Sequence, residues 1–241
     1  MKIDIITLFP NMFTGFLNES IIGRAIKEEK VEINLINLRD FTKEKHGHVD
    51  DTPFGGGAGM VLMCQPVFDC IKSVRTNDSL VIMMTPQGKS YSQAMAKELV
   101  LKDHLIILCG HYEGFDERIR GIVDLEVSIG DYVLTGGEIP AMAITDSIVR
   151  LIDGVIESDS HEYDSYSNWM LEHPQYTKPR VYEGMEVPEV LCNGNHKEIE
   201  KFKLKESLRR TYIRRPDLLE HHELSKEEKA LLDEIIKEEM K

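Results

Sequence analysis

The sequence predicts an α/β protein in which a mostly parallel sheet carries helices on both faces, followed by a small, mainly helical carboxyl-terminal domain. Short β-branched or aliphatic runs alternate with segments of helical spacing up to about residue 152, which is the pattern of successive βαβ units. This alternation stops after Gly154, and helical spacing dominates from residue 172 onward. A chain of 241 residues can hold one large domain or two modest ones, each with a buried core.

The first quarter of the chain is predicted to form strand, helix, strand and loop. Residues 2–8 alternate apolar and polar side chains and end before Pro10, which indicates a strand. Residues 11–29 have the spacing of one helix with an apolar side. Residues 31–38 alternate again and form the second predicted strand. A long loop over 40–60 follows, with the glycine-rich run PFGGGAGM.

The following elements continue the alternation. We expect helices over 65–75, 90–101 and 139–152, the last strongly amphipathic, strands over 80–84, 104–109 and 122–128, and a short helix near 116–120. The run TPQG at 85–88 is typical of a tight turn, because proline sets φ there. Ser225 and Glu228 form a capping box that opens the last helix.

The pattern of apolar and polar residues divides the sequence into three parts. Residues 1–155 contain the alternating strands and helices. Residues 156–171 are largely polar and unpatterned, which is typical of an exposed, flexible linker or lid. Residues 172–241 form the smaller helical domain.

Composition excludes several classes of protein. The hydrophobic fraction of 41% and the charged fraction of 29% are those of a soluble globular chain, and its apolar runs are too short to cross a bilayer. The amino terminus lacks a secretory signal, and four cysteines without a CxxC pair suit reduced thiols. We therefore expect a cytoplasmic protein without membrane contact. A net charge of −13 argues against a surface that binds nucleic acid everywhere, though not against a local basic face.

Glycines concentrate in one stretch, from Cys109 to Pro140, which holds six of the seventeen. They lie in two loops, each entered from a predicted strand. Glycine after a strand permits positive φ or a close approach to a ligand, and the carboxyl ends of strands are where ligands bind in α/β sheets. The stretch therefore predicts a ligand site made largely of backbone.

Two nucleotide-binding patterns are incomplete. Gly88-Lys89-Ser90 lacks the upstream glycine of a P-loop, because Met83 stands there, and the run Gly55–Gly59 never completes a dinucleotide fingerprint. His46, His48, Asp50 and Asp51 are close enough in sequence for a metal site, but nothing fixes a closed ligand set. A metal-dependent phosphohydrolase, solvated loop residues and hydrogen bonding to a base edge all remain open for this group.

The strongest charge contrast lies between His196 and Arg215, where eight Lys or Arg stand against three Glu. Lys203, Arg210 and Arg214 fall on one face of a helix, and Leu204, Leu208 and Tyr212 form an apolar stripe on another side. A basic helix in an acidic protein would focus a polyanion, so contact with nucleic-acid phosphates is its natural use. Arg150 and Asp164 are further candidates for chemistry, although spacing alone favours a surface acid at 164.

Long motifs make the chain similar to a known family. They are LFP at 8–10, RDFT at 39–42, VDDTPFGGGAGM at 49–60, TPQG at 85–88, CGHYEGFDERI at 109–119, SIGDYVLTGGEIPAM at 128–142, DSIVR at 146–150 and PRVYEGMEVPEVL at 179–191, with SLRRTYIRRPDLL beyond. The chain resembles the bacterial tRNA (guanine-N1)-methyltransferases that act on guanine 37, within the knotted SPOUT class of S-adenosylmethionine-dependent enzymes. Arg209 stands where the family pattern has glycine, which strengthens the basic face.

The resemblance implies a deep trefoil knot formed by the loops at 85–88, 109–114 and 129–137. By match to the family, the residues that line the S-adenosylmethionine site are Thr85, Pro86, Gly110, Glu113, Ile129, Gly130, Tyr132, Leu134, Gly136, Gly137 and Pro140. Residues 1–155 would then be the methyltransferase domain, and 172–241 the tRNA-binding domain.

The resemblance also implies roles for the remaining candidates. Asp164 matches the general base, which would accept the N1 proton of guanine, and Arg150 matches its partner. It implies a magnesium requirement, an obligate homodimer, and tRNA contacts from Asp50, Lys203, Arg209, Arg210, Arg214 and Arg215. Another knotted RNA methyltransferase and a non-catalytic RNA-binding module are the remaining alternatives.

Overall fold

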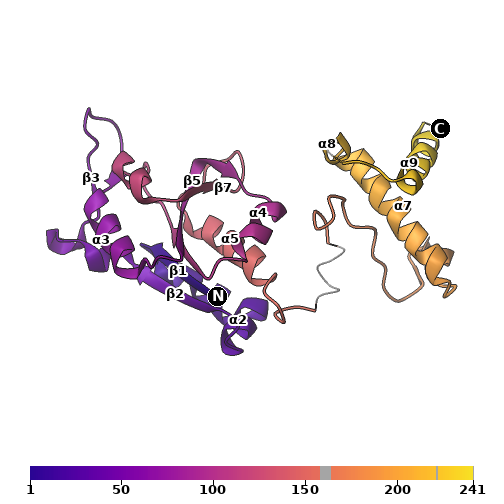
Figure 1. Cartoon of the computed structure of the whole chain (residues 1–241), viewed down its shortest axis with the longest axis horizontal. Coiled ribbons are helices and arrows are strands. Elements are labelled where there is room, and N and C mark those ends of the chain that lie inside the picture. The colour runs from indigo at the N-terminus through magenta and orange to yellow at the C-terminus, as the bar shows by residue number, and fades with distance from the viewer. Residues whose placement is uncertain (158–163, 221, 241) are drawn as a thin grey trace. The chain divides into compact units, whose positions relative to one another are not determined.

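The computed structural model describes residues 1–157, 164–220 and 222–240. The chain divides into two compact units, Met1–Ser158 and Asp159–Lys241 (Figure 1). Each unit has its own hydrophobic core. Within the described residues, no helix is both long enough and apolar enough to cross a membrane.

The first unit is built on a parallel sheet, which confirms the predicted fold class. Five strands of the described chain form it in the order β2-β1-β6-β5-β7. Their bounds are β1 Lys2–Thr7, β2 Glu32–Asn37, β5 Ser79–Ser90, β6 His104–Leu108 and β7 Leu125–Ser128. All four neighbouring pairs are parallel, so the carboxyl ends of the central strands meet at one edge.

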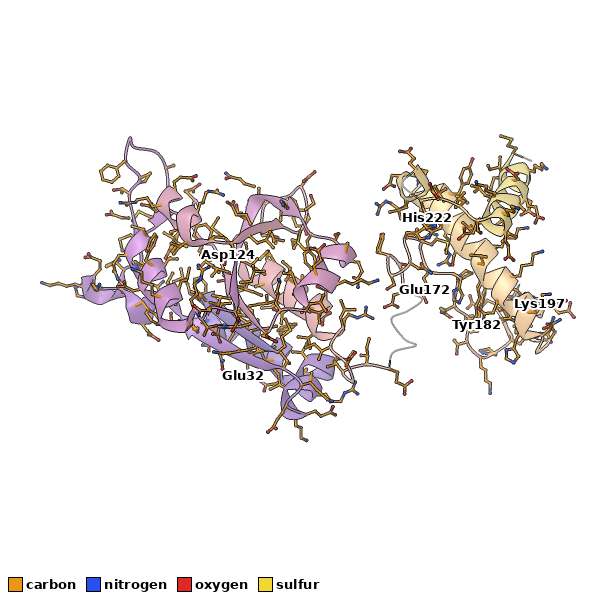
Figure 2. All side chains as sticks on the ribbon, in the orientation of Figure 1. Glu32, Asp124, Glu172, Tyr182, Lys197 and His222 are labelled. Carbon is orange, nitrogen blue, oxygen red and sulfur yellow. The ribbon has the colours of Figure 1, made fainter. Side chains whose placement is uncertain are left out.

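Helices cover both faces of this sheet, as predicted. One face packs against α1 (Thr14–Asn18), α2 (Ser20–Lys27), α4 (Gln93–Leu99) and α5 (Glu138–Val149). The other face packs against α3 (Cys64–Val74) and the 3₁₀ helices η2 (Leu38–Phe41) and η4 (Glu117–Ile122). Alternation along β1 explains the two cores, because Ile5 points to the first and Ile6 to the second. Asp124, labelled in Figure 2, fastens the start of β7 by accepting hydrogen bonds from Arg75 and from the amide of Val81.

Three predicted elements need correction. The single helix expected over 11–29 is broken into the 3₁₀ helix η1 (Pro10–Phe13), α1 and α2, because Glu19 is extended and Ser20 has a φ of 56°. The loop over 40–60 contains the 3₁₀ helix η3 (Lys45–Gly47) and contributes β3 (Asp50–Asp51), which pairs with β4 (Val61–Leu62). Helix α5 is not strongly amphipathic: apolar residues line its buried sides, and Ile139 on its outer side is 51% exposed.

The second unit is mainly helical. Its elements are β8 (Val181–Tyr182), β9 (Met185–Glu186), η5 (Glu189–Leu191), α7 (His196–Arg214), α8 (Asp217–Glu220) and α9 (Lys226–Glu239). Leu208 of α7 packs with Leu231 and Ile235 of α9, and Leu204 and Tyr212 flank this core as the apolar stripe predicts. The capping box of Ser225 and Glu228 opens α9, as predicted.

The linker predicted over 156–171 is divided between the two units: Ile156 packs against the first core, and residues 164–171 belong to the second unit. Met170 is buried in the core of that unit, and Trp169 packs against it. The amide of Leu171 donates to the buried Thr211 hydroxyl at 2.9 Å. Apolar anchors at 169–170 therefore hold residues 164–171 against α7. The expectation of a flexible segment over 158–163 falls on residues outside those that the structure describes.

Candidate active site

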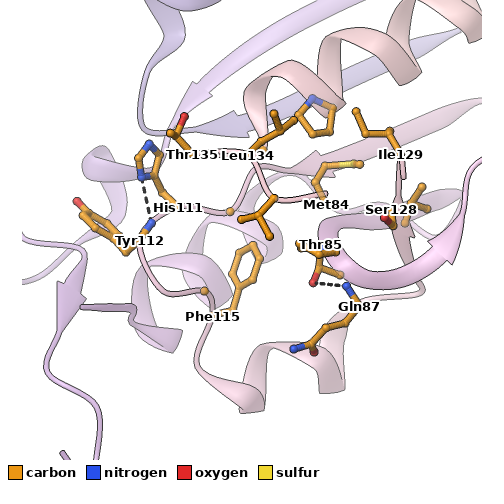
Figure 3. Close-up of a pocket in the computed structure, with 18 of the residues that line it drawn as sticks. Met84, Thr85, Gln87, His111, Tyr112, Phe115, Ser128, Ile129, Leu134 and Thr135 are labelled. Atoms are coloured by element: carbon orange, nitrogen blue, oxygen red, sulfur yellow. Dashed lines mark hydrogen bonds between the residues drawn. The ribbon is translucent and has the colours of Figure 1, made fainter. Parts of the chain in front are cut away.

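A cavity of about 380 Å³ lies at the carboxyl ends of β5, β6 and β7 (Figure 3). Its walls are residues 85–87, in an irregular part of β5, and the loops that follow β6 and β7. All eleven residues predicted for the methyl-donor site line it: Thr85, Pro86, Gly110, Glu113, Ile129, Gly130, Tyr132, Leu134, Gly136, Gly137 and Pro140. The topology therefore brings together residues that are 55 positions apart in the sequence.

The first wall comes from an irregular part of β5. The pairing of β5 with β7 shifts register between Met84 and Lys89, so residues 85–88 bulge from the sheet instead of forming the predicted isolated turn. The amide of Gln87 donates to the Thr85 hydroxyl at 3.3 Å, as Figure 3 shows. Gly88 is required here, because a Cβ atom at this position would lie 2.4 Å from the amide nitrogen of Val127.

The second wall follows β6. A Cβ atom on Gly110 would lie 2.7 Å from the ring of Phe115, so glycine lets the chain turn beside this aromatic side chain. The amide of Glu113 donates to the carbonyl of Met60 at 2.9 Å. This contact joins the glycine-rich loop before β4 to the wall of the cavity.

The third wall is the loop after β7, and its last residues pack against the second wall. Gly130 has a φ of 154°. Gly136 forms an antiparallel bridge with His111, and the amide of Gly137 donates to the carbonyl of Gly110 at 2.8 Å. The strand-end loops of β6 and β7 are thus hydrogen-bonded to each other directly above the sheet.

Two ionisable groups at or next to the cavity have opposite surroundings. Cys109, buried directly before the lining residue Gly110, has its pKa raised well above its usual value by burial and then by the negative charge of Glu138, which keeps the thiol neutral and unreactive. Arg120, which lines the cavity, bonds Gln87, Glu117 and Glu126. These bonds tie the 3₁₀ helix η4 to β5 and β7.

The cavity also meets the size expected for a cofactor. Small-molecule sites measure roughly 300–1,000 Å³ and combine apolar walls with a few polar groups. The lining combines apolar side chains such as Met84 and Leu134 with the polar groups of Thr85 and Glu113. These residues therefore fit S-adenosylmethionine, a ligand with an adenine ring, a ribose and a charged amino-acid tail.

Sequence reasoning missed several side chains of the cavity. They are Met84, Gln87, His111, Tyr112, Gly114, Phe115, Glu117, Arg120, Val127, Ser128, Val133 and Thr135. Most are direct neighbours of predicted residues, so proximity in the loops was an available signal. Arg120 had no such signal, because it reaches the cavity through the 3₁₀ helix η4.

The two predicted catalytic residues lie in different units. Arg150 is the C-cap residue of α5 in the first unit and is half-buried. Asp164 belongs to the second unit, where its carbonyl accepts a hydrogen bond from the amide of Ser167 at 3.0 Å. This segment is held to α7 by the anchors described above.

The described residues do not support a metal centre. The rings of His46 and His48 lie 6.4 Å apart and edge to face. No group of three or more His, Cys, Asp or Glu side chains in the described parts of the chain could hold a metal ion. His46, His48, Asp50 and Asp51, which all lie in the described part of the chain, therefore do not form such a group.

The basic residues of α7 differ in their surroundings. Lys203 pairs with Glu200, Arg210 reaches the carbonyl of Glu172 at 3.5 Å, and Arg214 is exposed. Arg209 pairs with Glu206, Glu238 and Glu239, and Arg215 pairs with Asp217 and bonds the Tyr166 hydroxyl. The predicted contact Asp50 lies in the other unit, half-buried in β3.

Comparisons with known proteins show the family of the chain. The family described as "tRNA (Guanine-1)-methyltransferase TrmD" matches residues 1–221. A tRNA (guanine-N(1)-)-methyltransferase of Fusobacterium nucleatum subsp. nucleatum is 56% identical over 241 residues, covering all of both chains. Proteins of the same name from Bacillus cereus (strain AH820) and Bacillus anthracis (strain A0248) are 55% identical over 240 residues, covering 98% of each chain. The chain therefore belongs to the tRNA (guanine-1)-methyltransferase family.

Proposed function

We propose that this protein transfers the methyl group of S-adenosylmethionine to N1 of guanine 37 in tRNA. Family membership over nearly the whole chain supports methyl transfer to a tRNA guanine. The observation that carries the proposal is the cavity at the ends of β5, β6 and β7, which collects every residue expected at the donor site. The choice of position 37 rests on the resemblance of the motifs.

The donor would be held mainly by backbone groups. Residues 85–87, 110–114 and 129–137 would surround it, and we infer that these loops thread through one another as a trefoil knot. The bridge between His111 and Gly136 and the hydrogen bond from Gly137 to Gly110 support a crossing of the last two loops. When bound, S-adenosylmethionine supplies an electrophilic methyl group on a positively charged sulfur.

The protein's own residues would handle the proton and the charge of the guanine base. N1 of guanine carries a proton and is a poor nucleophile until that proton leaves. Asp164 is the proposed general base that accepts it. The negative charge that then develops toward O6 would be stabilised by the guanidinium of Arg150.

A homodimer is part of the proposal, with Asp164 of one protomer facing the cavity of its partner. Large apolar side chains support it, because Phe9, Met12, Val133 and Ile139 are 39%, 48%, 83% and 51% exposed. Val133 lies in the third wall and Ile139 near the start of α5. Phe9, whose ring centroid is 4.8 Å from that of the lining residue His111, and Met12 follow β1. Exposed apolar side chains gathered around a site are typical of an interface.

The second unit would hold the tRNA. Lys203, Arg210 and Arg214 lie on α7 and would contact phosphates, with Arg209 and Arg215 as further candidates and Asp50 at a base edge. Magnesium and a cytoplasmic location stay predictions. The described residues offer no cluster of ligands for that ion.

The experiment that tests the proposed function measures methyl transfer to a defined RNA. The purified protein is incubated with labelled S-adenosylmethionine and a tRNA transcript that carries guanine at 36 and 37. We expect labelled 1-methylguanosine at position 37, and no label when guanine 37 is replaced by adenine. Transfer to ribosomal RNA instead of tRNA would identify another knotted RNA methyltransferase. If the protein neither binds the donor nor methylates any RNA, the non-catalytic RNA-binding module would be the remaining explanation.

A further inference from the structure

The proposed mechanism gives no task to the buried carboxylate of Glu138, which lies next to the donor cavity. Glu138 is the first residue of α5 and is only 2% exposed, although its neighbours in the sequence line the cavity. Acidic side chains are rarely buried this completely without partners. It lies at the amino end of a twelve-residue helix, where the helix dipole favours negative charge.

The hydrogen-bond partner of this carboxylate comes from the first strand of the unit, far away in the sequence. The hydroxyl of Thr7, the last residue of β1, donates to Oε1 of Glu138 at 2.8 Å, across 131 positions of sequence. The same hydroxyl accepts a hydrogen bond from the amide of Phe9 at 2.9 Å. Thr7 is itself 1% exposed. The end of β1 is therefore linked to the start of α5 by a fully buried, charge-assisted hydrogen bond.

The other side of the carboxylate faces the donor cavity's third wall. A Cβ atom on Gly136 would lie 2.4 Å from Oε2 of Glu138, so the glycine backbone rests directly on this oxygen. Gly136 also forms the antiparallel bridge with His111. Gly137 approaches the backbone of Cys109, where a Cβ atom would lie 2.7 Å from the Cα atom.

We infer that Thr7 and Glu138 are positioning residues. They fix the backbone of residues 136–138, the arm of the third wall that packs against the second wall, and so keep the donor cavity in the shape that binds the methyl donor. Neither residue lines the cavity, so they act through the backbone of Gly136 and Gly137. This inference rests on the proposed function, because it assumes that S-adenosylmethionine binds in this cavity.

Loss of the Thr7 hydroxyl is expected to affect binding of the methyl donor. Thr7→Val keeps the shape of the side chain and removes both of its hydrogen bonds, which leaves the buried carboxylate without its donor. The arm then loses one of its supports, so donor binding weakens while the second unit is untouched. Thr7→Ser retains the hydroxyl and is the variant that should restore binding.

Helix α5 offers a matched control. Thr145 is fully buried in the same helix, and its hydroxyl has no hydrogen-bond partner among the described residues. Thr145→Val therefore removes a buried hydroxyl from the same core without removing a hydrogen bond. Comparing it with Thr7→Val separates the loss of the Glu138 contact from the general effect of a threonine-to-valine change.

The test uses the full chain and S-adenosylhomocysteine as the probe, with binding measured by calorimetry. For Thr7→Val we expect its Kd to rise on the order of tenfold, with a raised KM for the methyl donor and an unchanged KM for tRNA. Thr7→Ser and Thr145→Val should bind like the wild type. In amide hydrogen exchange, Gly137 should exchange faster in Thr7→Val than in the two other variants.

Glu138→Gln is the second variant, in case Thr7→Val does not fold. Its amide oxygen can still accept from Thr7, but the negative charge is lost, so we expect a smaller rise of Kd. Wild-type affinity for the probe in both Thr7→Val and Glu138→Gln would overturn the inference while leaving the proposed function intact. Failure of the wild-type protein to bind the probe at all would contradict the proposed function itself.

Discussion

At the scale of single residues, the donor cavity depends on glycines whose Cα atoms touch other backbone. Gly137 joins two walls in this way, because a Cβ atom would meet the backbone of both Cys109 and Gly110 at 2.7 Å. Backbone atoms cannot turn away as a flexible side chain can. Two cavity walls would therefore have to separate to admit even one methyl group.

We predict that Gly137→Ala weakens binding of S-adenosylhomocysteine and destabilises the protein by about 1–3 kcal/mol, the usual cost of overpacking. Gly15→Ala is the control, because nothing lies within 4 Å of its Cβ position in α1, and alanine in a helix is favoured by about 0.5–1 kcal/mol. Urea unfolding and calorimetry measure both effects. Wild-type binding by Gly137→Ala would show that the close approach of the two walls is not needed.

A second prediction at this scale concerns the proposed general base. Asp164→Asn should lower the turnover number by about 10²–10⁴-fold, the usual contribution of acid–base catalysis, while the Kd for S-adenosylhomocysteine stays the same. Asp233→Asn makes the same chemical change at an exposed position of α9 in the same unit and should be fully active. An active Asp164→Asn enzyme would remove this carboxylate from the mechanism.

At the scale of elements, α7 and α9 are joined by a charged network. Lys205 and Arg209 of α7 pair with Glu234, Glu238 and Glu239 of α9. Hydrogen bonds from Arg209 and Lys205 lower the pKa of Glu238 from 4.5 to about 2. A carboxyl whose pKa is lower in the folded state stabilises that state at every pH above its pKa in the unfolded chain. This contribution is lost as the pH falls toward the pKa of the folded state.

We therefore predict that Arg209→Gln lowers the urea midpoint of the protein at pH 7. The difference from the wild type should shrink as the pH falls from 4.5 toward 2, where Glu238 becomes neutral. Arg214→Gln is the control, because this exposed arginine should leave stability unchanged but weaken tRNA binding. A stability difference for Arg209→Gln that does not change with pH would contradict the role of this network.

The surroundings of these arginines show why sequence reasoning was incomplete. The helical period correctly placed the apolar stripe of α7, because burial follows that period. It could not show that Arg209, on the predicted basic face, meets carboxylates from a helix about 30 positions later. Similarly, apolar spacing continued through residues 11–29 although the helix breaks at Ser20. Gly23 permits this break, because a Cβ atom there would lie 2.6 Å from the backbone of Asn18, and periodicity does not show that contact.

At the scale of the whole molecule, the alternation of strands and helices predicted the sheet and its two covered faces. The strand order, with β5 between β6 and β7, follows from long-range packing that periodicity does not contain. The cavity residues were predicted through the resemblance of long motifs, since no local rule indicates that loops after three separate strands meet. Neither periodicity nor motif resemblance predicted the contact of Thr7 with Glu138.

The proposed homodimer provides the prediction at this scale. Ile139→Asp places a charge among the exposed apolar side chains near the cavity, so sedimentation should show monomers and the methyl-transfer rate should fall. Leu101→Asp is the control: this leucine is 81% exposed in the turn before β6, at the opposite edge of the sheet. Dimers that persist in Ile139→Asp would place the interface elsewhere.

The most direct test of the account is a crystal structure of the protein grown with S-adenosylhomocysteine. We predict density for the ligand inside the cavity after β5, β6 and β7, in contact with the backbone of residues 85–87, 110–114 and 129–137. Density for the ligand at any other place, with this cavity filled only by solvent, would contradict the assignment of the donor site.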